Sequence, residues 1–291
     1  MPAQAKKRTD NRSRGAASTN PGIIPAKVIS WKRGEGARER IDALAREEPL
    51  EIRIRGRSVA VTLRTPGHDR ELAAGFLLAE GVLAQRSDVL EIALCSQGAT
   101  GERENILNVF LASSVAVDFE KLTRHVFASS SCGICGKASI ESVHQHFPPV
   151  DSLATVSTTI LLQLPPLLRS SQCTFDQTGG LHAAGVFSSK ADLIVSREDV
   201  GRHNAVDKVL GHAFLENLLP FDKHILMISG RASFEIMQKA LAARIPIVAA
   251  VSAPSSLAVE FARESGQTLI GFLRDESMNI YSHPERVIGQ A

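Results

Sequence analysis

Three short apolar runs, separated by two amphipathic segments, dominate the C-terminal part of the chain. The runs are residues 224–230 (HILMISG), 245–252 (IPIVAAVS) and 268–274 (TLIGFLR), and the segments between them are residues 232–244 and 255–266. A strand that is apolar throughout must be covered on both faces, which is the situation of strands in a parallel sheet. The pattern therefore predicts an α/β domain with a largely parallel sheet, helices on both faces and right-handed crossovers.

The region just upstream extends this domain. Residues 178–188 and 191–199 are expected to form strands, and residues 201–218 a helix with a buried apolar face. Residues 160–172 predict a helix that Pro165 and Pro166 would kink. We expect the domain to cover residues 126–291.

The N-terminal part has a different pattern. Residues 1–24 are polar and basic, so a disordered tail is expected there. Regular structure is first expected near residue 47, and residues 25–125 together should form a small α+β module. It should begin with a β-hairpin of alternating polar and apolar residues over residues 47–64, followed by a helix over residues 69–81 that ends at Gly81. Two strands, over residues 88–95 and 105–117, should follow.

Composition limits the classes of function. The net charge of +2 in 291 residues is too small to indicate nucleic-acid binding. No apolar run reaches the length of about 18 residues that a membrane span needs, and the N-terminus lacks the apolar core of a signal peptide. Four cysteines do not make a disulfide framework in a chain of this length. A reducing cytoplasm is therefore expected, where thiols stay free, bind metal or catalyse.

Two of these cysteines, Cys132 and Cys135, form a C-x-x-C motif in a run of serine and glycine. A structural zinc needs four ligands, and the nearest candidates, His144 and His146, lie at an unusual spacing. A redox dithiol is the second hypothesis, since a following helix and Lys137 would favour a thiolate. The third is a sulfur carrier, because a thiolate can hold a transferable sulfur as a persulfide. The residues alone leave redox chemistry and sulfur transfer open. The lone cysteines, Cys95 and Cys173, are expected to be small buried hydrophobes.

Four other segments suggest a ligand site. Residues 178–185 (TGGLHAAG) are rich in glycine, which lets a ligand approach the backbone beside His182. Residues 198–208 place seven polar or charged side chains at a helix start, among them Arg202 and His203. The alternative there is a solvated helix face with His203–Asp207 and Asn204–Lys208 pairs. The turns at residues 229–235 and 252–256 each join a strand to a helix start, where backbone N–H groups and Arg231 favour an anion, although helix capping alone also explains their serines.

Six motifs in this order make the chain closely resemble the FdhD/NarQ family of formate dehydrogenase accessory sulfurtransferases, from about residue 30 to the C-terminus. They are residues 65–81 (TPGHDRELAAGFLLAEG), 130–141 (SSCGICGKASIE), 178–185 (TGGLHAAG), 198–211 (EDVGRHNAVDKVLG), 229–235 (SGRASFE) and 271–284 (GFLRDESMNIYSHP).

The resemblance implies a fold similar to cytidine deaminase without its zinc, for the larger domain. It implies a sulfurtransferase that takes sulfur from a cysteine desulfurase and passes it to the molybdenum cofactor, bis-molybdopterin guanine dinucleotide, for formate dehydrogenase. Cys132 matches the persulfide cysteine and Cys135 the second thiol. A homodimer is also implied.

The family's cofactor contact falls on a segment whose flanks match and whose inner residues vary. It consists of Phe272, Leu273, Arg274, Asp275, Glu276 and Ser277. We add Arg231, His182, Arg202 and His203 as candidate contacts and expect guanine nucleotides to act as analogues of the cofactor. The alternative function is a non-catalytic cofactor chaperone whose C-x-x-C binds metal or docks a partner.

Overall fold

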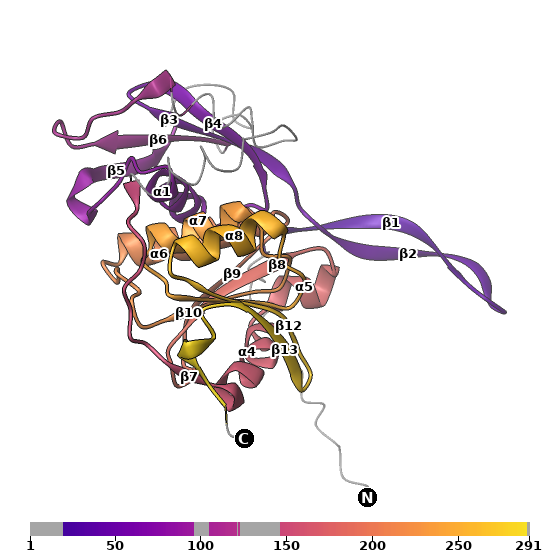
Figure 1. Ribbon diagram of the computed structural model, residues 1–291. Helices are drawn as coiled ribbons and strands as arrows, with labels where there is room; N and C mark the ends of the chain where they lie inside the picture. Colours follow the sequence, from indigo (N-terminus) through magenta and orange to yellow (C-terminus); the bar gives the residue numbers. More distant parts are fainter. Residues whose placement is uncertain (1–19, 96–104, 121, 123–145, 290–291) are drawn as a thin grey trace, which may run out of the picture.

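A computed structural model describes residues 20–95, 105–120, 122 and 146–289. Figure 1 shows an N-terminal module stacked on a larger domain, with a two-stranded arm projecting from the body. The module contains β3 (Glu48–Ile54), β4 (Arg57–Arg64), α1 (Asp69–Ala79), β5 (Val89–Leu94) and β6 (Ile106–Leu111). Its sheet has the order β4-β3-β6-β5. The predicted hairpin, helix and two strands are confirmed.

The larger domain has a six-stranded sheet of order β13-β12-β11-β10-β8-β9. Its strands are β8 (His182–Phe187), β9 (Leu193–Asp199), β10 (Ile225–Ile228), β11 (Ile247–Ala250), β12 (Thr268–Arg274) and β13 (Ser277–Ser282). Its helices are α4 (Thr158–Ser170), α5 (Cys173–Thr178), α6 (Arg202–Leu215), α7 (Phe234–Ala242) and α8 (Ser256–Glu264). The short strands β7 (Val156–Ser157) and β14 (Val287–Ile288) pair with each other beside it.

The sheet is mixed, which corrects the expectation of a largely parallel one. Only β10–β11 and β11–β12 pair in parallel, while β8 pairs antiparallel with both β10 and β9, and β12 with β13. The length of the connections between consecutive strands explains the antiparallel hairpins. The links from β8 to β9 and from β12 to β13 are short turns, and a strand that returns through a short turn must run antiparallel.

Helices cover both faces of this sheet, as expected. In β10, Leu226 and Ile228 pack into the core shared with α6, α7 and α8, whereas Ile225 and Met227 pack into a second core under α4. Successive side chains of a strand point to opposite faces, so a strand that is apolar throughout belongs at the middle of three layers. The layers are visible in Figure 1. Helix α4 runs as one helix through Pro165 and Pro166. Every helix within the described residues is too short or too polar to span a membrane.

The N-terminal module and the larger domain share one continuous apolar core. Helices α1 and α6 meet at Gly75 and Gly211, where an added Cβ would lie 1.9 Å from the Asp207 carbonyl oxygen and 1.7 Å from that of Glu71. The two backbones are therefore in direct contact, which only glycine at these positions allows. The arrangement fixes the module rigidly on α6.

Buried polar groups reinforce the joint between module and domain. Lys208 Nζ lies 2.7 Å from Asp199 Oδ2 and donates to the Thr65 carbonyl at 2.8 Å, while the Thr65 amide donates to the same Asp199 at 3.1 Å. Arg197 donates to both carboxylate oxygens of Glu71, at 2.6 and 2.7 Å. Because a buried charge without a partner is costly, these pairs hold the module and the domain in one relative position.

The arm was not foreseen from the sequence. It consists of β1 (Ile23–Lys32) and β2 (Gly36–Ala45), paired antiparallel along their whole length. Regular structure therefore begins at residue 23, ahead of the expected start near residue 47 and within the last residues of the predicted tail. Residues 1–19 of that tail lie outside the described residues.

Candidate functional site

The carboxyl ends of the parallel strands β10, β11 and β12 form one edge of the main sheet. Strand β8 runs antiparallel to β10, so its first residue, His182, lies at this same edge. The Ser229 amide donates to the Ala183 carbonyl at 2.9 Å, and the Ala183 amide donates to Ser229 Oγ at 2.8 Å. The glycine-rich strand start and the turn after β10 are therefore joined, at an edge where α/β proteins commonly bind ligands.

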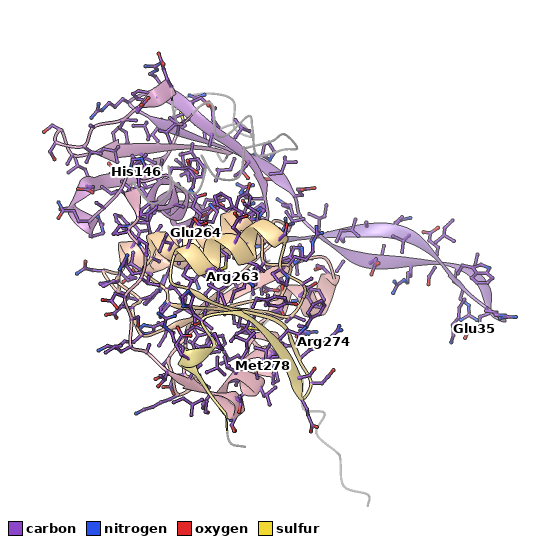
Figure 2. The ribbon with its side chains drawn as sticks, viewed as in Figure 1. Glu35, His146, Arg263, Glu264, Arg274 and Met278 are labelled. Carbon is purple, nitrogen blue, oxygen red and sulfur yellow. The ribbon has the colours of Figure 1, made fainter. Side chains whose placement is uncertain are left out.

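A cavity of about 800 Å³ opens at this edge, between the sheet and helices α4 and α5. Its apolar wall includes Leu162 and Phe175, and its polar wall includes His182, Arg274 and Asp275. A volume of this size, with one apolar side and a few convergent polar groups, is typical of sites for nucleotide-sized molecules. Figure 2 labels Arg274 on the sheet edge that faces α5.

The predicted cofactor segment is divided between this cavity and the core. Among its six residues, Arg274 and Asp275 line the cavity, whereas the Leu273 side chain is fully buried in the core under α4. A bulge between Gly271 and Arg274 interrupts the pairing with β13, and Phe272 and Asp275 have φ angles of 52° and 53°. Bulges redirect side chains, which explains how consecutive residues reach different surroundings.

The other three residues of the segment lie at the junction of β12 and β13: Phe272 in β12, Glu276 in the turn and Ser277 at the start of β13. Glu276 and Ser277 are exposed and do not line the cavity. Phe272 is partly exposed, and its ring lies 5.8 Å from the Arg274 guanidinium carbon, a distance at which a cation and an aromatic face attract. Phe272 therefore restrains the arginine that lines the cavity.

His182, Arg202 and His203 gather around the turn after β10. A Cβ built on Gly230 would lie 3.3 Å from His182 Nδ1 and 3.5 Å from Arg202 Cδ, so both side chains rest against this turn. Burial lowers the pKa of His182 below its usual value, and the Arg202 guanidinium lowers it further. Burial, aided by Arg202, lowers the pKa of His203 to about 3. Both imidazoles are therefore neutral near pH 7.

The Arg202 Nε atom is buried and has no hydrogen-bond partner among the described residues. A buried guanidinium nitrogen without a partner is unfavourable, and this one belongs to a residue outside the cavity lining. Of the candidate contacts outside the segment, His182 lines the cavity. Arg202 lies against Gly230 and His203 contacts Ser233, and neither is among the lining residues. Arg231 is exposed and is not part of the cavity lining.

The two helix-start turns differ in their use of serine. Ser255 caps α8 in the usual way, because its side chain accepts from the Ala258 amide at 3.2 Å. Ser233 makes no cap bond and instead lies 2.9 Å from His203 Nε2, which is also 3.0 Å from Glu235. Since His203 is neutral, the contact with Glu235 is a hydrogen bond rather than an ion pair. The turn after β10 is thus the one tied to the histidine cluster.

The polar cluster at residues 198–208 is not a solvated helix face. Asp207 pairs with Lys239 and Lys208 with Asp199, and all four residues are buried, in place of the i,i+4 pairs considered above. Glu198 accepts from the Thr174 and Phe175 amides at 2.9 and 2.8 Å, which fixes the start of α5 and so the cavity wall.

Sequence reasoning missed the cavity wall that α4 and α5 provide. Phe175 and Arg169 line the cavity, with the Arg169 guanidinium carbon 4.7 Å from the centre of the Phe175 ring. The one available signal was the position of Phe175, four residues before the glycine pair that opens residues 179–185. An aromatic ring beside an arginine offers a stacking surface for a flat heterocycle.

The C-x-x-C motif, with Cys132 and Cys135, lies outside the described residues. Of the residues that flank it, Leu122 is buried in the shared core and His146 lies beside Gly81 at the end of α1. The other two cysteines differ from expectation: Cys95 is only partly buried and Cys173 is exposed at the start of α5. Neither is a core residue, because each stands at the end of an element.

A profile of the FdhD/NarQ family matches residues 45–288. The chain belongs to the FdhD/NarQ family. The sulfur carrier protein FdhD of Mycolicibacterium paratuberculosis is 52% identical over 252 residues, covering 85% of this chain and 93% of that one. The sulfur carrier protein FdhD of Streptomyces coelicolor is 50% identical over 266 residues, covering 90% and 94%.

FdhD proteins at lower sequence identity also match most of this chain. The sulfur carrier protein FdhD of the archaeon Sulfolobus acidocaldarius is 43% identical over 246 residues, covering 84% of this chain and 91% of that one. A solved structure from Desulfotalea psychrophila, assigned as a formate dehydrogenase accessory protein, superposes with a TM-score of 0.72 at 26% identity. It covers 92% of this chain and all of its own. The predicted family and the α/β fold class are confirmed.

Proposed function

We propose that this FdhD/NarQ chain is a sulfur carrier that passes sulfur from a cysteine desulfurase to the molybdenum cofactor of formate dehydrogenase. Relatives named sulfur carrier proteins, at about half identity over most of both chains, support the general role. The observation that carries the proposal is the cavity of about 800 Å³, because Arg274 and Asp275 line it and belong to the segment that the resemblance assigns to the cofactor.

The sulfur step begins at Cys132. Its thiolate attacks the terminal sulfur of a persulfide on the desulfurase, so a new S–S bond forms and the desulfurase cysteine leaves as a thiolate. The electron count balances without an oxidant. In the release step the Cys135 thiolate attacks Cys132 Sγ, which forms a disulfide and expels the carried sulfur as hydrosulfide. A dithiol reductant then restores both thiols.

In this proposal the cavity binds the cofactor that receives the sulfur. Its substrate is bis-molybdopterin guanine dinucleotide, a molecule with flat heterocycles and phosphates. Phe175 and Arg169 offer a stacking surface, and Arg274 offers a cation for a phosphate group. His182 stays neutral near pH 7 and so binds by hydrogen bonding, while Asp275 is an acceptor for ring N–H groups. Guanine nucleotides share these groups and should bind in the same place.

The assembly that we propose has three further members. The chain works in the cytoplasm as a homodimer, meets a cysteine desulfurase to load sulfur, and meets the formate dehydrogenase catalytic subunit to deliver the cofactor. Free thiols at Cys132 and Cys135 suit a reducing compartment. The alternative is a chaperone that binds the cofactor in the same cavity without carrying sulfur, its two cysteines holding a metal or a partner.

Intact mass after incubation with a desulfurase and cysteine separates these functions. We expect a gain of one sulfur that a reductant removes, that maps to Cys132 and that is lost in Cys132→Ala. The melting temperature of Cys132→Ala should stay close to that of the wild type, whereas loss of a structural metal ligand removes folding free energy. Cys173→Ala is the matched control, because Cys173 is an exposed cysteine that lies in α5, outside the C-x-x-C motif. A sulfur gain that survives in Cys132→Ala, or stoichiometric zinc without any gain, contradicts the carrier proposal.

A further inference from the structure

The arm extends away from the body of the molecule, and Glu35 near its tip is the most distant residue labelled in Figure 2. Only its base is anchored. The Arg46 amide donates to the Gly22 carbonyl at 2.8 Å, and Ala45 lies against Gly180 beside α5. Beyond this base, β1 and β2 pair only with each other within the described residues.

One face of the arm is apolar and open. Residues directly opposite in an antiparallel pair share a face, and so do alternate residues of one strand. Ile29 and Trp31 are alternate residues of β1, and Ile41 lies opposite Lys27 on the same side. Their exposed fractions are 75% for Ile29, 70% for Trp31 and 63% for Ile41. Three large hydrophobic side chains on one face of the arm are thus exposed to solvent.

An arrangement of this kind is not stable by itself. An isolated two-stranded hairpin is at best marginally stable in water, because it has no third strand and no core to cover its apolar face. Large exposed apolar patches mark sites of protein association, and tryptophan is among the residues that most often carry their binding energy. The exposed face of the arm therefore needs a covering surface.

The charges on the arm argue for a protein partner. Each acidic residue of the arm has a basic partner in the arm: Glu39 with Lys27, Glu35 with Lys32 and Arg38, and Asp42 with Arg40. Four of the basic residues are thus already paired, which is not the row of free cations that nucleic-acid phosphates or an anionic membrane require. The apolar face itself carries only the Lys27–Glu39 pair between its hydrophobic side chains.

The area of the arm argues for a second copy of this chain. Ten residues per strand at about 3.3 Å each, in a ribbon roughly 10 Å wide, give a face of about 330 Å². One arm lying on one partner would bury about 660 Å² in total, below the range of about 1,200–2,000 Å² for stable interfaces. Two arms exchanged about a two-fold axis would double this to about 1,300 Å² and reach that range.

We propose that two copies of this chain bind each other through their β1–β2 arms, each arm lying across the other copy with Ile29, Trp31 and Ile41 buried in the contact. This inference names the interface of the homodimer proposed above, and it rests on that assembly but not on sulfur transfer. Trp31 is the sole tryptophan in the sequence, so intrinsic tryptophan fluorescence reports on this contact alone.

The test measures molar mass by light scattering and Trp31 emission on the same samples of the full chain. The wild type should have twice the 31.3 kDa of one chain. On dilution, its Trp31 emission should move to longer wavelength as the side chain becomes hydrated. The double variant Ile29→Glu with Ile41→Glu keeps Trp31, and it should have the mass of one chain and the long-wavelength emission at every concentration.

Ser30→Glu is the matched control. Ser30 lies between Ile29 and Trp31 in β1 but on the opposite face, so its variant should remain a dimer. A second variant replaces residues 27–41 by Asn-Gly, which joins the directly opposed Ala26 and Asp42 through a tight turn and should be monomeric with an unchanged melting temperature.

Three results would overturn the proposal: a wild type with the mass of one chain at about 100 µM, a dimer that the double variant leaves intact, or a Trp31 shift that occurs only when a desulfurase is added. Persulfide loading of Cys132 is measured separately on each variant. Loading without dimerisation refutes the arm interface alone, and a dimer without loading refutes the carrier alone.

Discussion

At the scale of single residues, the cavity depends on side chains held by unusual backbone. Phe272 and Asp275 both have positive φ angles, which cost free energy for residues other than glycine. Leu273 between them is fully buried, and it anchors the bend in the core. The strain is therefore maintained by packing, and its effect is to present Arg274 and Asp275 to the cavity.

Arg274→Ala should weaken binding of guanine nucleotides without changing the fold. A hydrogen bond to a charged group contributes about 1.5–3 kcal/mol, so we expect a loss of about tenfold to a hundredfold in affinity. Thermal shift at increasing concentrations of GDP measures it, because a ligand that binds only the folded state raises the melting temperature. Arg70→Ala is the control, since Arg70 is exposed on α1 and does not line the cavity. Equal shifts for both variants would mean that Arg274 does not contact the nucleotide.

At the scale of elements, the crossing of α1 and α6 determines how the module is held. A helix-interior glycine is ordinarily less favourable than alanine by about 1 kcal/mol, so Gly→Ala in a helix usually stabilises a protein. Gly75 and Gly211 are exceptions. Here an added methyl group would occupy the space of the opposite backbone, and the helices would have to separate.

Gly211→Ala should therefore destabilise the protein, against the usual helix preference. Forcing extra volume into a packed contact costs about 1–3 kcal/mol, and here the obstacle is backbone, which cannot rotate away. Urea unfolding followed by circular dichroism gives the difference. Gly289→Ala is the control, because the nearest atom to its added Cβ is 4.0 Å away. A Gly211→Ala protein as stable as the wild type would contradict the close crossing.

At the scale of the whole molecule, charge joins the module to the domain. Burial acts to raise the pKa of Glu71, but the hydrogen bonds from Arg197 and His68 lower it to about 2, well below its usual value of 4.5. The folded state thus holds the proton of Glu71 less tightly than the unfolded state does. Its stabilisation is fully present above about pH 4.5 and is lost as the pH falls towards 2.

Glu71→Gln should remove this pH dependence together with the stabilisation. A shift from 4.5 to about 2 corresponds to about 3 kcal/mol at neutral pH. The free energies of unfolding of wild type and variant should differ most near pH 7 and converge as the pH falls through 4.5 towards 2. Glu264→Gln, at an exposed position on α8, should follow the wild type at every pH. A constant difference across this range would show that Glu71 does not act through its charge.

The sequence predicts the parts of this molecule that face a core. The strands at residues 225–228 and 247–250 are apolar because both of their faces are covered, and this periodicity is visible without a structure. The arm is invisible to such reasoning, since most of its length packs on no core and its alternation is broken by Pro25 and the glycines at its turn. Its strands form through pairing with each other, and the spacing of apolar residues in the sequence does not reveal such pairing.

The candidate site was predictable in position and not in composition. His182 was expected from the glycine-rich segment at residues 178–185, and Arg274 and Asp275 were expected from the family resemblance. All three line one cavity. The apolar wall from α4 and α5 was missed, because distant parts of the chain meet there only after folding. Leu273 could not be separated from its neighbours, since a bulge, and not a sequence pattern, decides which side chain turns inwards.

Helix α5 adjoins both the arm and the cavity. Strand β2 contacts α5, Ala45 lies against Gly180 two residues beyond the end of this helix, and Phe175 of α5 forms part of the cavity wall. A partner that binds the arm and a ligand that fills the cavity therefore both act next to α5. Thermodynamic linkage makes their influence mutual: if holding the arm changes the affinity of the cavity by some factor, filling the cavity changes the hold on the arm by the same factor.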